Sequence, residues 1–333
     1  MPKATYILAL TALAIPLLTH AQTRTAPTMA FLDIPQSTRL VGLGGLHTLS
    51  GTTSSNLIFH NPSAITDTTA GEISLNITPI TNGIKYTSAA YTHHINQLGN
   101  FSIGLLCALY GNFNQTDQNA NNIGQFSAHE TAIYLSYARQ LSPHLRLGAT
   151  LKPIYSKMAD QTAIAIAIDM GATLSFANGQ LNTALSINNA GALIKPYTTN
   201  NNHAPLPFDI KTSISYKPQH APFRILLTLK DITQWDLSPA HDKTLNPADN
   251  LLRHILIGLE FIPVRAFYFT IGYDHRQRRE LTDTDTGGMA GFAWGAGLNI
   301  AKINIQYAHA RYHAAGSLNS ITIATNWRRW AKH

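Results

Sequence analysis

Apolar and polar residues alternate along most of this chain. In Leu145–Ser156, apolar residues at every second position are separated by polar or small ones such as Arg146 and Lys152. Period-two alternation predicts strands whose two faces meet unlike environments. The fourteen segments with this pattern are Glu72–Ile80, Lys85–Ile95, Asn100–Gly111, His129–Gln140, Leu145–Ser156, Thr162–Phe176, Gln180–Ala190, Phe208–Lys217, Phe223–Ile232, Leu252–Phe261, Val264–His275, Gly291–Ile300, Lys302–His313 and Leu318–Trp327.

The connections between these segments alternate in length. Short ones such as Ile262-Pro263 alternate with four long ones, namely Asn112–Ala128, Gly191–Pro207, Thr233–Leu251 and Arg276–Ala290. An even number of strands, with tight turns at one end and long loops at the other, is typical of bacterial outer-membrane barrels. A soluble β-sandwich is the alternative, but its strands average about 5–6 residues. The sequence therefore predicts an all-β fold, a 14-stranded antiparallel transmembrane β-barrel.

The first residues predict export. Lys3 precedes the apolar run Ile7–Leu18, and Thr19-His20-Ala21 is a small-x-small cleavage site, as in a secretory signal peptide. We therefore divide the chain into a signal peptide (residues 1–21), an N-terminal periplasmic or plug segment (residues 22–70) and the barrel (residues 71–333). The expected location is the bacterial outer membrane.

The stretch Ala30–Asp67 does not alternate. Because a barrel of this size has a lumen too wide for its own strand side chains to fill, we expect this stretch to fold inside as a plug. A phosphate-binding loop is the alternative, but it needs a further glycine at position 47, which is His47. The glycines are therefore assigned to tight turns and close packing against the wall. The candidate plug residues are Arg39, Gly42, Gly44, Gly45, Asn61 and Pro62.

Composition and charge exclude several function classes. Charged residues make up 12% of the chain and the net charge is +7, with lysines and arginines scattered rather than clustered. Nucleic-acid binding is therefore not expected, whereas contact with outer-membrane lipids and lipopolysaccharide at the rims is. The single cysteine, Cys107, precludes an intramolecular disulfide. It shares parity with apolar residues, so we expect an apolar filler.

Catalytic signatures are missing. The chain has no Gly-x-Ser-x-Gly elbow, and His129-Glu130 lacks the second histidine of a zinc motif. His93 and His94 are adjacent and would point to opposite faces of a strand. Asp283-Thr-Asp285-Thr-Gly287 lacks the downstream glutamate of a calcium loop. We predict that the protein is not an enzyme and has no catalytic residues, no metal site and no cofactor.

The long outer loops are the candidate partner-binding surface, because aromatic residues and arginine are enriched among interface hot spots. Two other roles stay open: a rim anchor for Trp235, and contact with lipopolysaccharide phosphates for the arginines. The candidate contact residues are Phe113, Tyr197, Trp235, Asp236, Arg276, Arg278 and Arg279.

The segment Phe31–Gly45 (FLDIPQSTRLVGLGG), followed by Asn61-Pro62-Ser63, resembles the N-terminal signature of the PorQ/PorV family of outer-membrane proteins of the Bacteroidetes type IX secretion system. Later pieces agree, among them Gly291–Leu298 and Gly316–Asn319, and the resemblance covers nearly all of the mature chain. Where the family more often has Ser-Ala-Arg and Asn-Pro-Ala, this chain has Thr38 and Ser63.

This resemblance implies a barrel like the fatty acid transporter FadL, with a non-enzymatic role in a surface attachment complex. The chain would anchor a surface protein of the PorZ type, together with PorU-like and PorV-like components. Two alternatives remain: a FadL-like transporter of a hydrophobic small molecule, and a PorV-like shuttle that binds secreted cargo proteins. The inward positions carry residues such as Lys152, Lys211 and Arg224, and such a polar lumen disfavours an apolar channel.

Overall fold

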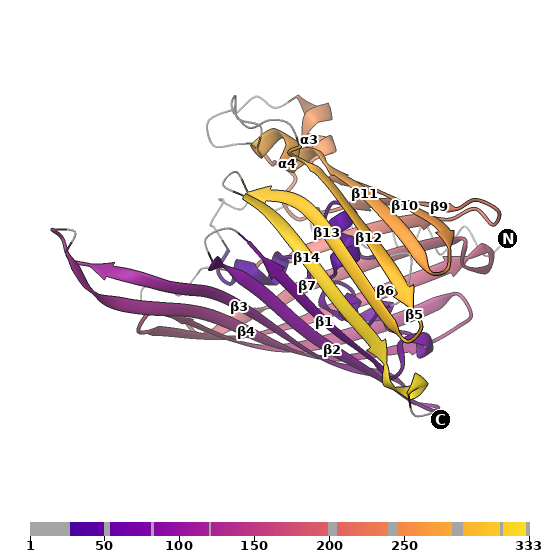
Figure 1. Ribbon diagram of the computed structural model, residues 1–333, viewed down its shortest axis with the longest axis horizontal. Helices are drawn as coiled ribbons and strands as arrows, with labels where there is room; N and C mark the ends of the chain where they lie inside the picture. The colour runs from indigo at the N-terminus through magenta and orange to yellow at the C-terminus, as the bar shows by residue number, and fades with distance from the viewer. Residues whose placement is uncertain are drawn as a thin grey trace.

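The computed structural model describes residues 27–49, 54–80, 83–119, 121–198, 205–238, 246–281, 289–313 and 316–330. The described strands form a closed antiparallel barrel in which each strand pairs with its neighbours in sequence and β1 pairs with β14 (Figure 1). The fourteen strands are β1 Glu72–Pro79, β2 Lys85–Ile95, β3 Gly99–Thr116, β4 Asn122–Gln140, β5 Leu145–Met158, β6 Gln161–Phe176, β7 Leu181–Lys195, β8 Asp209–Tyr216, β9 Phe223–Leu229, β10 Ile255–Val264, β11 Phe267–Asp274, β12 Phe292–Ile300, β13 Ile303–His313 and β14 Gly316–Asn326. The predicted fold class is confirmed.

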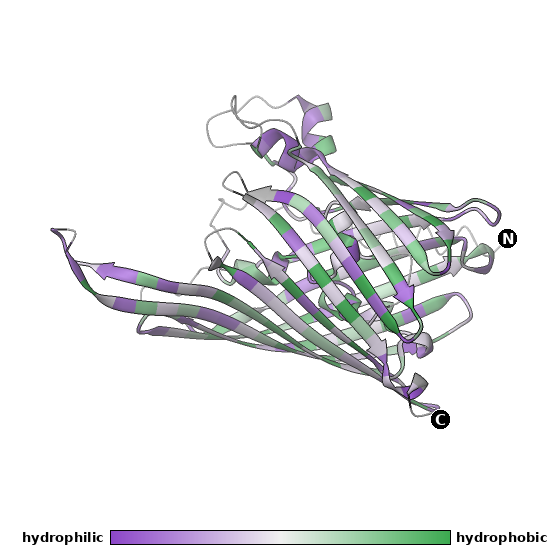
Figure 2. Ribbon diagram, viewed as in Figure 1, coloured by the Kyte–Doolittle hydropathy of each residue, from purple (hydrophilic) through white to green (hydrophobic). Residues whose placement is uncertain are grey.

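The alternation of side chains follows the sequence pattern. On β5, Leu147 and Leu151 are about 40% exposed on the outer face, whereas Thr150 and Lys152 are buried in the lumen. Figure 2 shows the resulting bands of apolar and polar residues along the strands. Because only lipid favours a continuous apolar outer face, this register is that of a membrane barrel.

One predicted long connection is wrong. The stretch Asn112–Ala128, interpreted as an outer loop, is mostly strand, because β3 and β4 continue beyond the wall as a projecting hairpin (Figure 1). Phe113 therefore lies on β3 and stacks on Phe126 with ring centroids 5.3 Å apart. Both faces of this hairpin are exposed to the same surroundings, so its residues have no reason to alternate.

Other boundaries also differ from the predictions. Strand β7 continues to Lys195 instead of ending at Ala190, and Val264 ends β10 instead of opening β11, so the predicted turn Ile262-Pro263 lies within β10. Two long connections contain helices, α3 Pro247–Arg253 and α4 His275–Leu281. Within the described ranges, no helix has the length and apolarity needed to cross a membrane.

The N-terminal segment lies inside the lumen. Its ordered pieces are η2 Ala30–Asp33, α2 Thr38–Gly42, η3 Ser55–Phe59, η4 Pro62–Ala64 and η5 Asp67–Thr69. Helix α2 packs against β11 to β14, η3 against β1 to β4, and η4 against β4 to β6, so the plug reaches most of the wall (Figure 1). The predicted signal peptide lies outside the described residues.

One plug residue bridges the place where the barrel closes. The hydroxyl of Thr38 is hydrogen-bonded to Ser320 at 2.8 Å and to Thr322 at 2.7 Å, both on β14. It also accepts a hydrogen bond of 3.0 Å from the side-chain amide of Asn76 on β1. The plug is therefore attached to both strands of the β1–β14 seam.

Glycines in the wall allow the plug backbone to approach the wall backbone closely. A Cβ atom added to Gly272 would lie 1.9 Å from the carbonyl carbon of Leu43, and one added to Gly148 would lie 2.5 Å from that of Pro62. On the plug side, Gly44 has φ of +96°, a conformation that glycine adopts without strain. The plug backbone thus sits directly against the wall backbone.

Gly148→Ala and Gly272→Ala should each unseat the plug locally. The added methyl group would overlap plug backbone, which cannot move aside as the end of a flexible side chain can. We expect faster protease cleavage of the plug and a lower midpoint in thermal unfolding. The matched control is Ala149→Val, which adds bulk at the neighbouring exposed position and should leave both measurements unchanged. Equal behaviour of the glycine variants and the control would contradict this prediction.

Candidate functional site

The plug is fixed by a buried ion pair that we call the plug clamp, made of Arg39, Arg224 and Glu260. The Nε and Nη2 atoms of Arg39 on α2 donate to the two carboxylate oxygens of Glu260 on β10, at 2.6 and 3.0 Å. Arg224 on β9 donates to the same carboxylate at 2.7 Å. The guanidinium of Arg39 also lies 3.8 Å from the ring centroid of Tyr268. Bidentate pairing of this kind fixes orientation as well as charge.

The wall itself carries further pairs facing the lumen. Lys152 on β5 pairs with Asp169 on β6 at 2.6 Å, and Lys230 pairs with Asp274 on β11 at 2.7 Å. Lys211 pairs with Asp209, two residues earlier on β8, at 3.1 Å. Charges removed from water need such partners. The lumen is polar, as the alternation predicts.

Around the plug clamp the lumen is filled. Leu40, Val41 and Leu43 of the plug have no exposed surface, and neither do Glu260 and Thr270 on the facing wall. A side chain with no accessible surface has no water-sized space beside it. Around the plug clamp, these described side chains of the plug and the wall are therefore packed directly against one another.

Helices α3 and α4 form a cap above the outer end of the barrel (Figure 1). Asp249 on α3 accepts a hydrogen bond from His275 at 2.7 Å and lies 2.9 Å from Arg253 and 3.1 Å from Arg279. The hydrogen bond from His275 is the main reason that the pKa of Asp249 is lowered to about 2, and the arginines add to it. One carboxylate therefore joins the two helices.

Most of the predicted contact residues belong to this cap. Arg276 pairs with Asp231 at 3.0 Å and with Glu280 at 2.9 Å, and Arg279 pairs with Asp249, so both help to fold the cap. Trp235 stacks on His254 with centroids 4.8 Å apart and stays 51% exposed.

The remaining two cap residues also make contacts within it. Arg278 donates to the carbonyl of Ala290, and Asp236 accepts from the backbone N–H of Ser238. The structure thus brings five of the seven predicted contact residues together on one side of the outer end.

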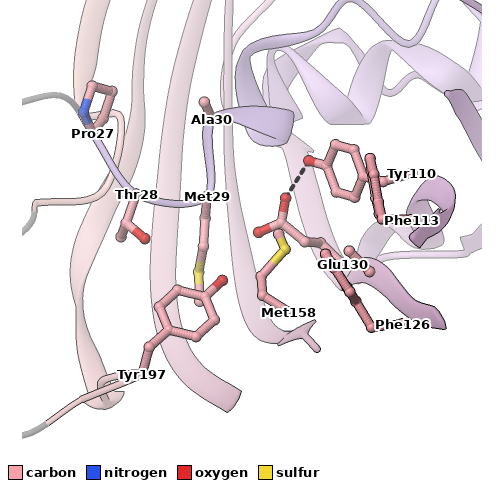
Figure 3. A pocket seen from close by; sticks show the side chains of 11 residues that line it. Pro27, Thr28, Met29, Ala30, Tyr110, Phe113, Phe126, Glu130, Met158 and Tyr197 are labelled. Carbon is pink, nitrogen blue, oxygen red and sulfur yellow. Dashed lines mark hydrogen bonds between the residues drawn. The ribbon is translucent and has the colours of Figure 1, made fainter. Parts of the chain in front are cut away.

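The other two predicted residues meet at a pocket of about 560 Å³ at the base of the projecting hairpin (Figure 3). We call it the mouth pocket. Its walls come from residues 27–30, β3, β4, β5 and the segment after β7. The side chains that dominate it are Met29, Phe113, Phe126, Met158, Tyr197 and Glu130.

The N-terminal segment contributes one wall of the mouth pocket. The backbone N–H of Thr28 donates to the carbonyl of Pro205 at 2.9 Å, which attaches this segment to the β7–β8 connection. On another wall, the hydroxyls of Ser156 and Tyr197 are hydrogen-bonded to each other. The described chain therefore begins at the outer mouth and crosses the lumen to reach β1.

Sequence reasoning did not identify the buried glutamates of the plug clamp and of the mouth pocket. Glu260 and Glu130 occupy inward positions of alternating strands, and a carboxylate there signals a buried partner. The partner could not be identified, because Arg39 lies 221 residues before Glu260 and no spacing rule joins them. Met29 lies in the predicted periplasmic or plug segment (residues 22–70), but it precedes the stretch Ala30–Asp67 and was not singled out.

No protein-family model matches this chain, and no curated protein matches it. Among solved structures it is similar to the Pseudomonas putida toluene transporter TodX, with a TM-score of 0.51 and 9% identity over 91% of this chain and 97% of that one. It is also similar to the CymD monoaromatic hydrocarbon channel, with a TM-score of 0.51 and 10% identity over 90% and 99% of the two chains. A Pseudomonas aeruginosa FadL homologue gives a TM-score of 0.46 at 9% identity over 92% and 99%.

At this identity the likeness to TodX and CymD shows the fold alone. The chain has the closed β-barrel fold of these proteins. This agrees with the predicted fold class, and it leaves the substrate or partner to be argued from the site.

Glu260→Gln should release the plug. The substitution removes the carboxylate charge that Arg39 and Arg224 share in the plug clamp, so the two guanidinium groups repel each other more strongly. Breaking a buried pair in this way costs about 3–5 kcal/mol. We expect the wild-type barrel to be closed in planar-bilayer recordings and the variant to show discrete conductance steps.

The control for that experiment is Glu280→Gln, which makes the same chemical change on a half-exposed carboxylate of the cap. It should leave the barrel closed. A Glu260→Gln barrel that is as silent as the control would show that the clamp does not hold the plug.

The contact between α3 and α4 should depend on acid pH. The pKa of Asp249 is lowered from 3.8 to about 2 in the folded cap, so its stabilising contribution is present above pH 4 and is lost as the pH falls toward 2. Hydrogen exchange of the α4 amides, corrected for the intrinsic pH effect, should accelerate over that range. In Asp249→Asn the exchange should be fast throughout and show no such step; a step that persists in this variant would assign it to another group.

Proposed function

We propose that this chain is a closed outer-membrane barrel that holds a protein partner at the cell surface through its outer end. The observation that supports the proposal is the packing of the plug inside the lumen, where it is held by a buried ion pair and lies directly against glycines of the wall. A closed barrel would not conduct solutes, but it would give a surface protein a rigid anchor in the membrane. Such a role requires no catalysis.

The projecting β3–β4 hairpin is the feature best placed to contact a partner. Strand β3 pairs with β2 only as far as Leu109, and β4 pairs with β5 only from Ala128 onward. Beyond those points both outer edges of the hairpin have no strand beside them within the described residues. Phe113 and Ile123 are also exposed there, at 41% and 58%. Free edges and exposed apolar residues both favour association with another chain.

The partner is inferred from the resemblance to the PorQ/PorV family. On that basis we propose a PorZ-like surface protein of the type IX secretion system, with PorU-like and PorV-like proteins in the same complex. The cap would add a second contact area through Trp235. A PorV-like shuttle that binds secreted cargo would use the same outer surface, and the identity of the bound protein distinguishes the two.

The second candidate function is binding and transport of a hydrophobic small molecule. The mouth pocket favours it, and so do the names of the similar structures, a toluene transporter and a monoaromatic hydrocarbon channel. The comparisons support this candidate more than the first. Transport would require the plug to leave its clamp, and for that reason we place it second.

Shortening the hairpin should release a surface partner. Phe113 and Phe126 pair directly, so replacing residues 114–125 with Asn-Gly joins them by a two-residue turn and leaves the mouth pocket in place. We expect a normally inserted, heat-modifiable barrel and at least a tenfold loss of the surface protein that is chemically crosslinked to it.

The control variant shortens the opposite end, replacing residues 218–221 of the β8–β9 connection with Asn-Gly. It should retain the partner fully. Equal retention by both variants would contradict the hairpin assignment. If the wild-type barrel binds no surface protein, and cells need it to take up labelled toluene, the second candidate holds instead.

A further inference from the structure

Glu130 on β4 differs from the other buried acids of the barrel. Asp169, Asp209, Glu260 and Asp274 are each 7% exposed or less and each pairs with a lysine or arginine. Glu130 is 2% exposed, and none of the ion pairs between described residues includes it. Removing a carboxylate from water without a counter-charge is costly. Among the described residues, Glu130 therefore lacks the cationic partner that the other four buried acids have.

The described neighbours of Glu130 supply hydroxyl groups rather than a cation. The hydroxyl of Tyr110 donates to its Oε2 atom at 2.5 Å (Figure 3). Ser156 stands directly opposite on β5, and the hydroxyl of Ser156 is hydrogen-bonded to that of Tyr197. These groups fix the carboxylate but do not neutralise it.

Glu130 is one of the residues that line the mouth pocket (Figure 3). Met158 lies close to Glu130 in Figure 3, Met29 lies across the pocket near Tyr197, and Phe113 and Phe126 are on the hairpin side. A volume of about 560 Å³ lies in the range of small-molecule sites. Methionine side chains adapt to ligands of different shape, and aromatic faces attract cations.

We propose that the mouth pocket binds a small hydrophobic amine, with Glu130 accepting a charge-assisted hydrogen bond from its ammonium group. The apolar body lies against the methionines and phenylalanines, and the ammonium supplies the counter-charge that the other four buried acids already have. An anionic amphiphile would be repelled by the same carboxylate. The inference rests on the second candidate function only in taking the mouth pocket as a ligand site, and it does not require the plug to move.

Three ligands with one body and different head groups test this. The full chain, purified in detergent, would be titrated calorimetrically at pH 7 with 2-phenylethylamine, 2-phenylethanol and phenylacetate, each against a detergent blank. We expect the amine to bind at least about tenfold more tightly than the alcohol, because hydrogen bonds to charged groups are the stronger ones. Phenylacetate should bind most weakly.

Glu130→Gln keeps the shape and the hydrogen bond from Tyr110 but removes the charge. It should abolish the preference for the amine while leaving binding of the alcohol within about twofold. Phe126→Ala should weaken all three ligands by a similar factor, because it removes contact with their common body. Heat-modifiability on gels would confirm that both variants remain folded.

The outcomes separate the two claims. If the amine and the alcohol bind the wild-type barrel equally, or if Glu130→Gln keeps the amine preference, the ammonium assignment is wrong and the mouth pocket remains a neutral hydrophobic site. If none of the three ligands binds, both the assignment and the use of this pocket by the second candidate function are overturned.

Discussion

A closed wall of fourteen strands encloses more space than its inward side chains can fill, and the rest of the structure depends on how that space is occupied. The chain uses its own N-terminal segment. Because the inward faces of the strands are polar and partly charged, an apolar filler would leave them without partners. The plug therefore brings Arg39 to Glu260, and the wall makes room for the plug backbone with glycine.

The filled interior separates the two ends of the molecule. Inside, buried ion pairs and hydrogen bonds join plug to wall and neighbouring wall strands to each other. At the outer end, by contrast, groups that could contact another molecule are available. The β3–β4 hairpin has unpaired strand edges, the cap exposes Trp235, and the mouth pocket is lined by aromatic rings and Glu130. Activity at the outer end does not require any change in the interior. This is the physical basis for preferring a surface role in a fold that its structural relatives use as a channel.

The sequence predicted what the bilayer imposes. Lipid on one face and a polar lumen on the other force alternation, so all fourteen strands could be located and their polar faces, with residues such as Lys152, assigned to the lumen; the pairing register between strands could not be predicted. The prediction of secondary structure failed in the segments that lie outside the membrane, where lipid imposes no alternation. Residues 112–127 show no alternation because both faces of the projecting hairpin lie outside the membrane, and they were interpreted as a loop. The helix starting at Pro247 was missed although Asn246 caps it, because the surrounding connection has no apolar stripe.

The plug illustrates a different limit. Its lack of alternation and the width of the lumen were enough to place it inside, and Arg39 could be singled out. Its partner could not, because the pairing of Arg39 with Glu260 depends on which strands surround the plug after closure. The same applies to Glu130, whose significance comes from the absence of a neighbouring cation among the described residues. Such facts belong to the assembled barrel and not to local sequence.

The hydrogen bonds of Thr38 with Asn76 on β1 and with Ser320 and Thr322 on β14 have a consequence for biogenesis. The last strand to be synthesised must meet the first, and Thr38 precedes both in the chain. Asn76 also donates directly to the hydroxyls of Ser320 and Thr322, so wall residues and Thr38 form one hydrogen-bonded group at the seam. Closing the barrel and seating the plug therefore involve the same polar side chains, and a substitution at any one of them would affect both.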